Sequence, residues 1–369
     1  MLETAVGVGS VLRLVRDGRA STRTELARQS GLSRSTLAER VQALLALDLL
    51  QETTGSASTG GRPPATLTFN RAAGCVLVAD FDVTRCRIAA CDLGAVPLAE
   101  AEYTYDPGAA PEAILAELHH RFVSVLLAAG VAQDRVRGVG IGLPASLAEL
   151  PGWSGLSVPD WFSAPVLLDG HVNLMALGER WTHWRDVDHL LFVAVGTRID
   201  CGIVSEGRVH RGARGTAGDI GHMPVAGHDV DCRCGNVGCL EAVAGAGALA
   251  AGLEVTSAAE VVSHVRAGTP AALQATRAAG RAIGEVLAAC ITFYNPAVIV
   301  LGGELAGASE PLLAGVREAA FARSPPMATR ELRMSLARLG ERAGLIGAAV
   351  MVVEHVLAPE YVDRLARAS

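Results

Sequence analysis

The chain has 369 residues, of which half are apolar and 19% are charged, and its net charge is −6. This length is long for one domain and sufficient for a sizeable core. The acidic balance excludes a protein that is basic throughout. No run of eighteen apolar residues lacks a polar interruption, and no basic-then-apolar leader opens the chain. These features predict a cytoplasmic protein with no membrane partner.

Charge is distributed unevenly along the chain. Residues 1–70 contain eight arginines against six acidic residues, so this head carries +2 and the remainder carries −8. A weakly basic head on an acidic body is typical of a DNA-binding module joined to a ligand-binding body.

Three short helices are predicted in the head. Apolar residues recur at helical spacing from Val8 and indicate the first helix. Thr22, with Glu25 three positions later, forms a capping box that begins the second. Gly31 then predicts a turn, and Ser33 is a suitable N-cap for the third. Two helices joined by such a turn are typical of a helix-turn-helix. The alternative is a three-helix module that binds another protein.

A β-wing is predicted after the third helix. Residues 49–53 and 65–69 have strand character and flank the Gly/Ser/Pro-rich segment 55–64, which contains Arg62. An arginine fixed beside two prolines could enter a minor groove, while small hydroxyls and arginines on the third helix suit phosphates and base edges. The predicted DNA-binding residues are Ser33, Arg34, Ser35, Thr36, Arg40 and Arg62.

From residue 75 onward, apolar segments of strand type alternate with helical stretches. The clearest strand candidates are residues 75–79, 87–91, 136–143 and 190–195, and the clearest helix is 111–129. This alternation predicts an α/β fold.

The run His222, then Cys232, Cys234 and Cys239, has the residue types and spacing of a metal site. Three thiols spaced C-x-C-x4-C and one imidazole supply the four ligands of a closed tetrahedral zinc site, which predicts a structural metal. The alternatives are a chance cluster of thiols, or a disulfide pair with one thiol left over.

The same segment resembles the signature of the ROK family of repressors and sugar kinases. The matching runs are Gly215-Thr-Ala-Gly-Asp-Ile-Gly-His222, the cysteine segment through Glu241, Asn173–Glu179, Asn295–Gly303 and Gly344–Ala349. The resemblance implies a winged helix-turn-helix followed by a two-lobed actin-like (ribonuclease H-like) domain with a structural zinc. The implied domains are the head at 1–70, a first lobe at 71–185, which the C-terminal helix 346–369 is a candidate to complete, and a second lobe at 186–345 with the zinc segment 219–241.

The loops that resemble the kinases' phosphate-binding loops have lost glycines. The first reads Asp80-Phe-Asp-Val-Thr84, and the second reads Gly196-Thr-Arg-Ile-Asp-Cys-Gly202. Side chains there take up space that phosphates need, and the added carboxylates repel them. His171 stands where the family's catalytic aspartate is expected. We therefore predict no catalytic residues and no enzyme activity.

The resemblance also implies an effector pocket. The predicted ligand-binding residues are Asn173, His171, Asp219 (usually glutamate in the family), His222 and Glu241. The predicted function is a DNA-binding transcriptional regulator, a repressor controlled by a sugar or sugar-derived effector, acting on operator DNA as a homodimer or homotetramer. The alternatives are a regulator with a vestigial pocket that a protein partner controls, and a sugar kinase with a DNA-binding head.

Overall fold

The computed structural model describes residues 6–53, 65–144, 161–305 and 310–368. The chain divides into two compact units. The first comprises Met1–Ile141, Glu149–Leu168 and Ala348–Ser369, and the second comprises Gly142–Ala148 and Asp169–Gly347.

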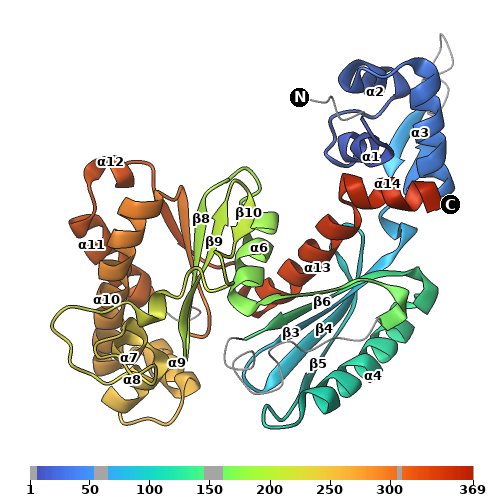
Figure 1. Ribbon diagram of the computed structural model, residues 1–369. Coiled ribbons are helices and arrows are strands. Elements are labelled where there is room, and N and C mark those ends of the chain that lie inside the picture. Colours follow the sequence, from blue (N-terminus) through green and yellow to red (C-terminus); the bar gives the residue numbers. More distant parts are fainter. Residues whose placement is uncertain (1–5, 54–64, 145–160, 306–309, 369) are drawn as a thin grey trace. The chain divides into compact units, whose positions relative to one another are not determined.

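The head begins the first unit with three helices and a two-stranded antiparallel sheet (Figure 1). Its elements are α1 (Val8–Arg16), α2 (Arg23–Ser30), α3 (Arg34–Ala46), β1 (Leu50–Thr53) and β2 (Thr66–Phe69). The predicted capping box is present, because the Thr22 hydroxyl accepts from the Glu25 amide while the Glu25 carboxylate accepts from the Thr22 amide. Gly31 has φ of 68°, and Ser33 caps α3, as predicted.

The rest of the first unit is built on a sheet of order β5-β4-β3-β6-β7. Its strands are β3 (Cys75–Phe81), β4 (Arg85–Asp92), β5 (Pro97–Thr104), β6 (Val136–Leu143) and β7 (Val166–Gly170). Helix α4 (Pro111–Ala129) packs on β4 and β5, and α13 (Ala343–Val356) packs on β6. These two helices lie on opposite sides of the sheet (Figure 1). The connections between these elements include short 3-10 turns at Arg71–Ala73, Gln133–Arg135 and Trp161–Ser163.

The C-terminal segment is two helices, which corrects the prediction of one helix over 346–369. Helix α13 ends at Val356, and α14 spans Pro359–Ala368. Proline disfavours helical geometry in the residue before it and has no amide hydrogen to continue the ladder. Among the described residues, no single helix is long and apolar enough to cross a membrane, and one pair bent by 54°, Gly340–Val356 with Pro359–Ala368, meets that length and composition together.

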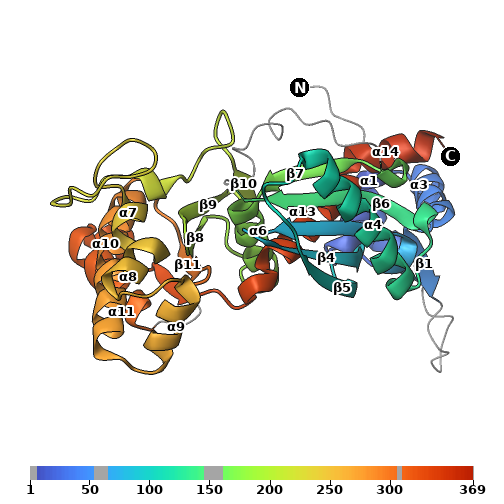
Figure 2. The same ribbon diagram turned by 90° about the horizontal axis from the view of Figure 1, so that it is seen from below.

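The second unit has three layers, in which a sheet of order β10-β9-β8-β11-β12 lies between helices on both faces (Figure 2). Its strands are β8 (Leu190–Val195), β9 (Ile199–Ser205), β10 (Arg208–His210), β11 (Val298–Gly302) and β12 (Arg333–Leu336). One face carries α7 (Leu240–Ala244), α8 (Ala246–Gly252), α9 (Ala258–Arg266), α10 (Pro270–Tyr294), α11 (Glu310–Arg323) and α12 (Pro326–Thr329). Helix α6 (His171–His183) covers the other face. Alternate β8 side chains enter the two cores, as with Leu191 and Phe192.

Helix α6 belongs to the second unit, so the boundary lies earlier than the predicted residue 185. The cause is close packing on β9. A Cβ added to Gly202 would lie 2.6 Å from the Val172 carbonyl oxygen. At the other end of α6, the fully buried Glu179 accepts from the amides of Arg338 and Leu339 at 2.6 and 2.7 Å. Both contacts join α6 to later parts of the second unit.

Candidate functional site

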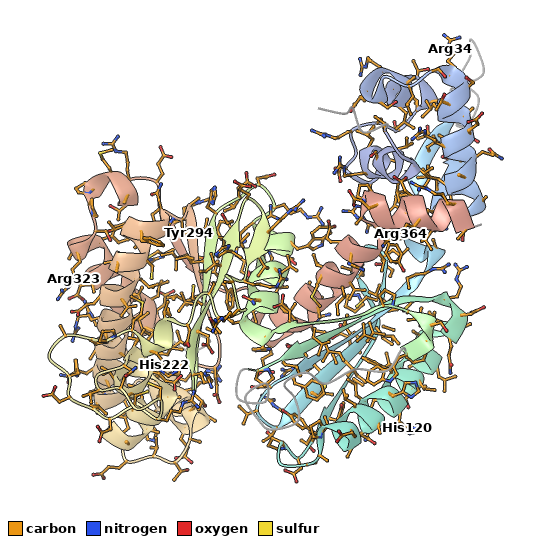
Figure 3. All side chains as sticks on the ribbon, in the orientation of Figure 1. Arg34, His120, His222, Tyr294, Arg323 and Arg364 are labelled. Carbon is orange, nitrogen blue, oxygen red and sulfur yellow. The ribbon has the colours of Figure 1, made fainter. Side chains whose placement is uncertain are left out.

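The four predicted metal ligands come together between the 3-10 turn Ile220–His222 and the start of α7. Figure 3 places His222 beside α7. Between them, the chain reverses tightly. Gly235 has φ of 90°, and a Cβ on Gly238 (φ 73°) would lie 2.5 Å from the His228 carbonyl oxygen. The Cys232 amide donates to the Asn236 carbonyl at 2.8 Å, which closes the loop around the cysteines.

The ligand atoms fit one tetrahedral ion. All four lie within 4.8 Å of one another. Cys232 Sγ lies 3.5 Å from His222 Nδ1, and Cys234 Sγ lies 3.7 Å from Cys239 Sγ. A zinc tetrahedron with ordinary Zn–S and Zn–N bonds has edges of about 3.6–3.8 Å, so the donor set and its spacing suit zinc. Because Nδ1 faces the thiols, Nε2 is the ring nitrogen left for a second interaction.

The thiols of this cluster differ from one another. The backbone amide of Asn236 is the main cause that lowers the pKa of Cys234. Desolvation raises the pKa of Cys239, and the neighbouring thiols raise it further, to about 12. The neighbouring thiols thus act in opposite directions, since hydrogen bonds from Cys232 and Cys239 help to lower the pKa of Cys234. A cation bound by the thiolates would complement their negative charge.

Glu241 is the most enclosed carboxylate beside the metal cluster, with its side chain 10% exposed. Its Oε2 accepts a hydrogen bond from the Ile199 amide at 3.3 Å. Its Oε1 forms an ion pair with Nε of Arg233 at 2.9 Å. Asp219 precedes the 3-10 turn that carries His222 and is exposed. Within the described residues, no ion pair includes Asp219. The structure therefore gives two predicted effector residues, Glu241 and Asp219, different surroundings.

Asp200 adds a third carboxylate to this region. Desolvation is the main cause that raises the pKa of Asp200, the Arg198 guanidinium opposes it, and the charges of Asp219 and Glu241 raise it further. Arg198 Nε lies 3.7 Å from Asp200 Oδ2. In the sequence Asp200 counts only as a lost glycine of a phosphate loop, and its nearness to Glu241 depends on the tertiary fold.

The predicted residues at the start of α6 form a separate cluster around Asp169. Asn173 is buried, and its Nδ2 donates to Asp169 Oδ1 at 2.9 Å. Arg211 Nη2 and Nε contact Asp169 Oδ2 at 2.5 and 3.0 Å. His171 is the first residue of α6 and is half-buried. Asn173 thus braces the start of the helix through Asp169, and no hydrogen bond or ion pair among the described residues joins it to Glu241.

The predicted DNA-binding residues lie at and after the N-terminus of α3. Ser33 Oγ lies within hydrogen-bond distance of the hydroxyls of Ser35 (3.0 Å) and Thr36 (2.9 Å), so these small groups form one polar surface. Arg34 is exposed at the start of the helix (Figure 3), and Arg40 is half-buried. No ion pair with another described residue neutralises either arginine. The predicted wing tip and Arg62 lie outside the described residues.

Together these features define a chain of two α/β units, the first of which begins with a head of three helices and a two-stranded sheet and the second of which carries a Cys/His cluster. The model of the ROK family matches residues 157–355. A candidate xylose repressor of Caldicellulosiruptor sp. strain Rt8B.4 is 30% identical, and the match covers 95% of this chain and 96% of that protein. The chain belongs to the ROK family, as its sequence motifs predicted, and has the actin-like α/β fold of that family.

Two further relatives differ in how much of this chain they match. The glucokinase of Thermotoga maritima is 29% identical over 59% of this chain and 80% of its own length. Among solved structures, a ROK family transcriptional regulator described as a homologue of the Escherichia coli MLC protein has a TM-score of 0.82 at 24% identity, covering 98% of both chains. The matches with the regulators therefore cover nearly the whole chain, whereas the match with the kinase covers a smaller part of it.

Proposed function

We propose that this protein is a DNA-binding transcriptional regulator, a repressor whose operator affinity is controlled by a sugar or sugar-derived effector. The observation that carries this proposal is the match with a candidate xylose repressor over nearly the full length of both chains. A match of this extent includes α3, the helix that Ser33 caps. On this proposal, α3 enters the major groove with Arg34 and Arg40, and the wing brings Arg62 to the duplex. The protein would act in the cytoplasm, where its operator is.

Three residues of the second unit are the proposed effector contacts: Asp219, His222 and Glu241. Carboxylates pair with the vicinal hydroxyls of a polyol, and an imidazole whose Nδ1 binds metal has its proton on Nε2, where it can donate to a hydroxyl oxygen. Zinc bound by His222, Cys232, Cys234 and Cys239 would hold this arrangement in place without an open coordination position.

Loss of kinase activity is part of the proposal. Arg198 and Asp200 stand where the family kinases have glycines, and the half-exposed Asp82 stands in the other loop. The Val83 amide donates to Asp82 Oδ1 at 2.8 Å, so a side chain already occupies that turn. Carboxylates at both loops oppose a triphosphate. His171 replaces the expected catalytic carboxylate.

A symmetric oligomer completes the proposal. One short recognition helix contacts few base pairs, so two heads on a two-fold axis would read paired half-sites. We propose a homodimer or homotetramer, which light scattering of the full-length protein would measure.

One set of experiments tests the function. Genomic fragments selected by the full-length protein would be measured by fluorescence anisotropy with and without D-xylose and D-glucose, and a coupled ATP assay would be run with the same sugars. We expect a specific fragment, a sugar that changes its affinity, and no ATP turnover. Specific DNA binding that no sugar alters would favour the vestigial pocket, and sugar-dependent ATP turnover would favour the kinase.

A further inference from the structure

We propose that Arg233 is a built-in competitor for the effector: it occupies Glu241 in the free protein, and a sugar must displace it. This inference rests on the proposed effector function and assigns a specificity-determining residue to that site. Sequence motifs alone do not indicate it, because Arg233 lies between two cysteines whose role is to bind metal.

Each oxygen of the Glu241 carboxylate has a partner within the protein. Its Oε2 is held by the Ile199 amide at 3.3 Å, and its Oε1 is held by Arg233 at 2.9 Å. A polyol that pairs two hydroxyls with this carboxylate therefore approaches oxygens that each have one partner, and at Oε1 it competes with the Arg233 guanidinium for the same charge. The backbone amide belongs to β9 and cannot leave without disrupting the sheet. Arg233 is the partner that can be displaced.

Glu241 and Arg233 differ in solvent exposure, and this difference favours displacement of the arginine. The Glu241 side chain is 10% exposed and fixed at the start of α7, whereas the Arg233 side chain is 50% exposed. An ion pair with one solvated partner is weak, because the guanidinium recovers its hydration when it leaves. The buried carboxylate, by contrast, keeps a strong need for donors. A sugar hydroxyl can supply one.

The cysteine loop fixes the position of the Arg233 backbone. Its neighbours Cys232 and Cys234 are both in the Cys/His cluster, and the Gly235 amide donates to the Cys232 carbonyl at 2.9 Å. The backbone at Arg233 is therefore fixed on both sides while its side chain remains free to swing outward. Sugar binding would expel the side chain and leave the cysteine loop unchanged.

Calorimetric titration of the zinc-loaded full-length protein tests this inference. D-xylose and D-glucose would each be titrated into wild type, Arg233→Ala and Arg233→Lys. Arg323→Ala is the matched control, because Arg323 pairs with Glu285 at 2.8 Å on the surface of the same unit. We expect Arg233→Ala to bind the sugar about two- to tenfold more tightly, from the modest strength of such pairs. Arg233→Lys should fall between wild type and Arg233→Ala, and Arg323→Ala should match wild type.

Each outcome decides between the two proposals. Wild-type binding that is unchanged or weakened in Arg233→Ala, with zinc content and melting temperature preserved, overturns the role of Arg233 and leaves the effector site standing. Sugar binding by Arg233→Ala alone supports both. If neither sugar binds to any of these proteins, the effector function is overturned, and the role of Arg233 is overturned with it.

Discussion

Asp363, in the C-terminal helix, accepts a hydrogen bond from the backbone amide of Gly9, in the first helix, at 2.9 Å. The carboxylate thereby binds the N-terminal end of α1, where amides lack partners and the helix dipole favours negative charge. Gly9 has no side chain to separate the two helices, and a Cβ there would collide with the backbone of Pro359. A second link joins Arg16 to Glu354 at 2.5 Å. Helix α1 of the head thus contacts both C-terminal helices, α13 and α14.

The first prediction concerns these contacts. Asp363→Ala should lower the free energy of unfolding by about 0.5–2 kcal/mol, because the α1 terminus loses its acceptor and its favourable charge. Gly9→Ala should cost more, since the two helices must separate. Chemical denaturation followed by circular dichroism measures both, with the exposed Asp186→Ala as control. Equal stability of Asp363→Ala and wild type would show that this hydrogen bond does not hold α14 to α1.

The second prediction concerns the arginines of α3. Arg34→Ala and Arg40→Ala should each weaken operator binding and reduce the slope of log affinity against log salt by about 0.9, if each displaces counterions from one phosphate. Anisotropy titrations at several salt concentrations measure this slope. Arg121→Ala is the control, since Arg121 pairs with Glu117 on α4. An unchanged slope in both α3 variants would place the DNA elsewhere on the head.

The third prediction concerns the metal. Purified protein should contain close to one zinc per chain, and Cys234→Ser should lose most of it, because three ligands hold zinc more weakly than four. A chelator should lower the melting temperature of the wild type, since metal binding contributes to folding stability. Cys290→Ser, which changes a half-buried thiol outside the cluster, should keep its zinc. Metal analysis that finds well under half an equivalent in the wild type would remove zinc from the site.

The features that the sequence predicted well depend on short-range rules. Thr22 and Glu25 cap each other across three residues, and the helix predicted at 111–129 has those bounds because a proline begins it and Gly130 ends it at φ of 66°. The Cys/His cluster follows for the same reason, since three of its ligands lie within eight residues.

The features that it did not predict depend on contacts made by the folded chain. Arg211 and Asp169 are 42 residues apart, as are Ile199 and Glu241, and no local pattern joins either pair. The placement of α6 in the second unit follows from the bare backbone at Gly202, whose significance appears only once Val172 lies against it. The break before α14 is different, because Pro359 was a signal in the sequence for two helices.

The fourth prediction concerns Asp200. Its folded-state pKa is raised, so its ionised form is disfavoured by folding and reduces stability above that pKa. Asp200→Asn should therefore be more stable than wild type near pH 8, and the difference should shrink as the pH falls toward the unfolded value of about 3.9. Denaturation at several pH values measures the difference. Asp188→Asn, at a carboxylate 70% exposed, is the control. A difference that grows as the pH falls would contradict this assignment.

The last prediction concerns the link between effector and operator. A ligand shifts an equilibrium only by its differential affinity for the two states, which typically amounts to about 1–3 kcal/mol. We therefore expect the effector to change operator affinity by roughly five- to 150-fold, and the operator to change effector affinity by the same factor. Anisotropy gives the first factor, and calorimetry with and without operator DNA gives the second. Glu241→Ala should abolish the response, because the sugar loses its most enclosed carboxylate. Glu318→Ala, at a carboxylate that pairs with Arg277 at 2.9 Å on the same unit, should retain it. Identical sugar affinity with and without DNA would leave a DNA-binding protein whose pocket does not control it.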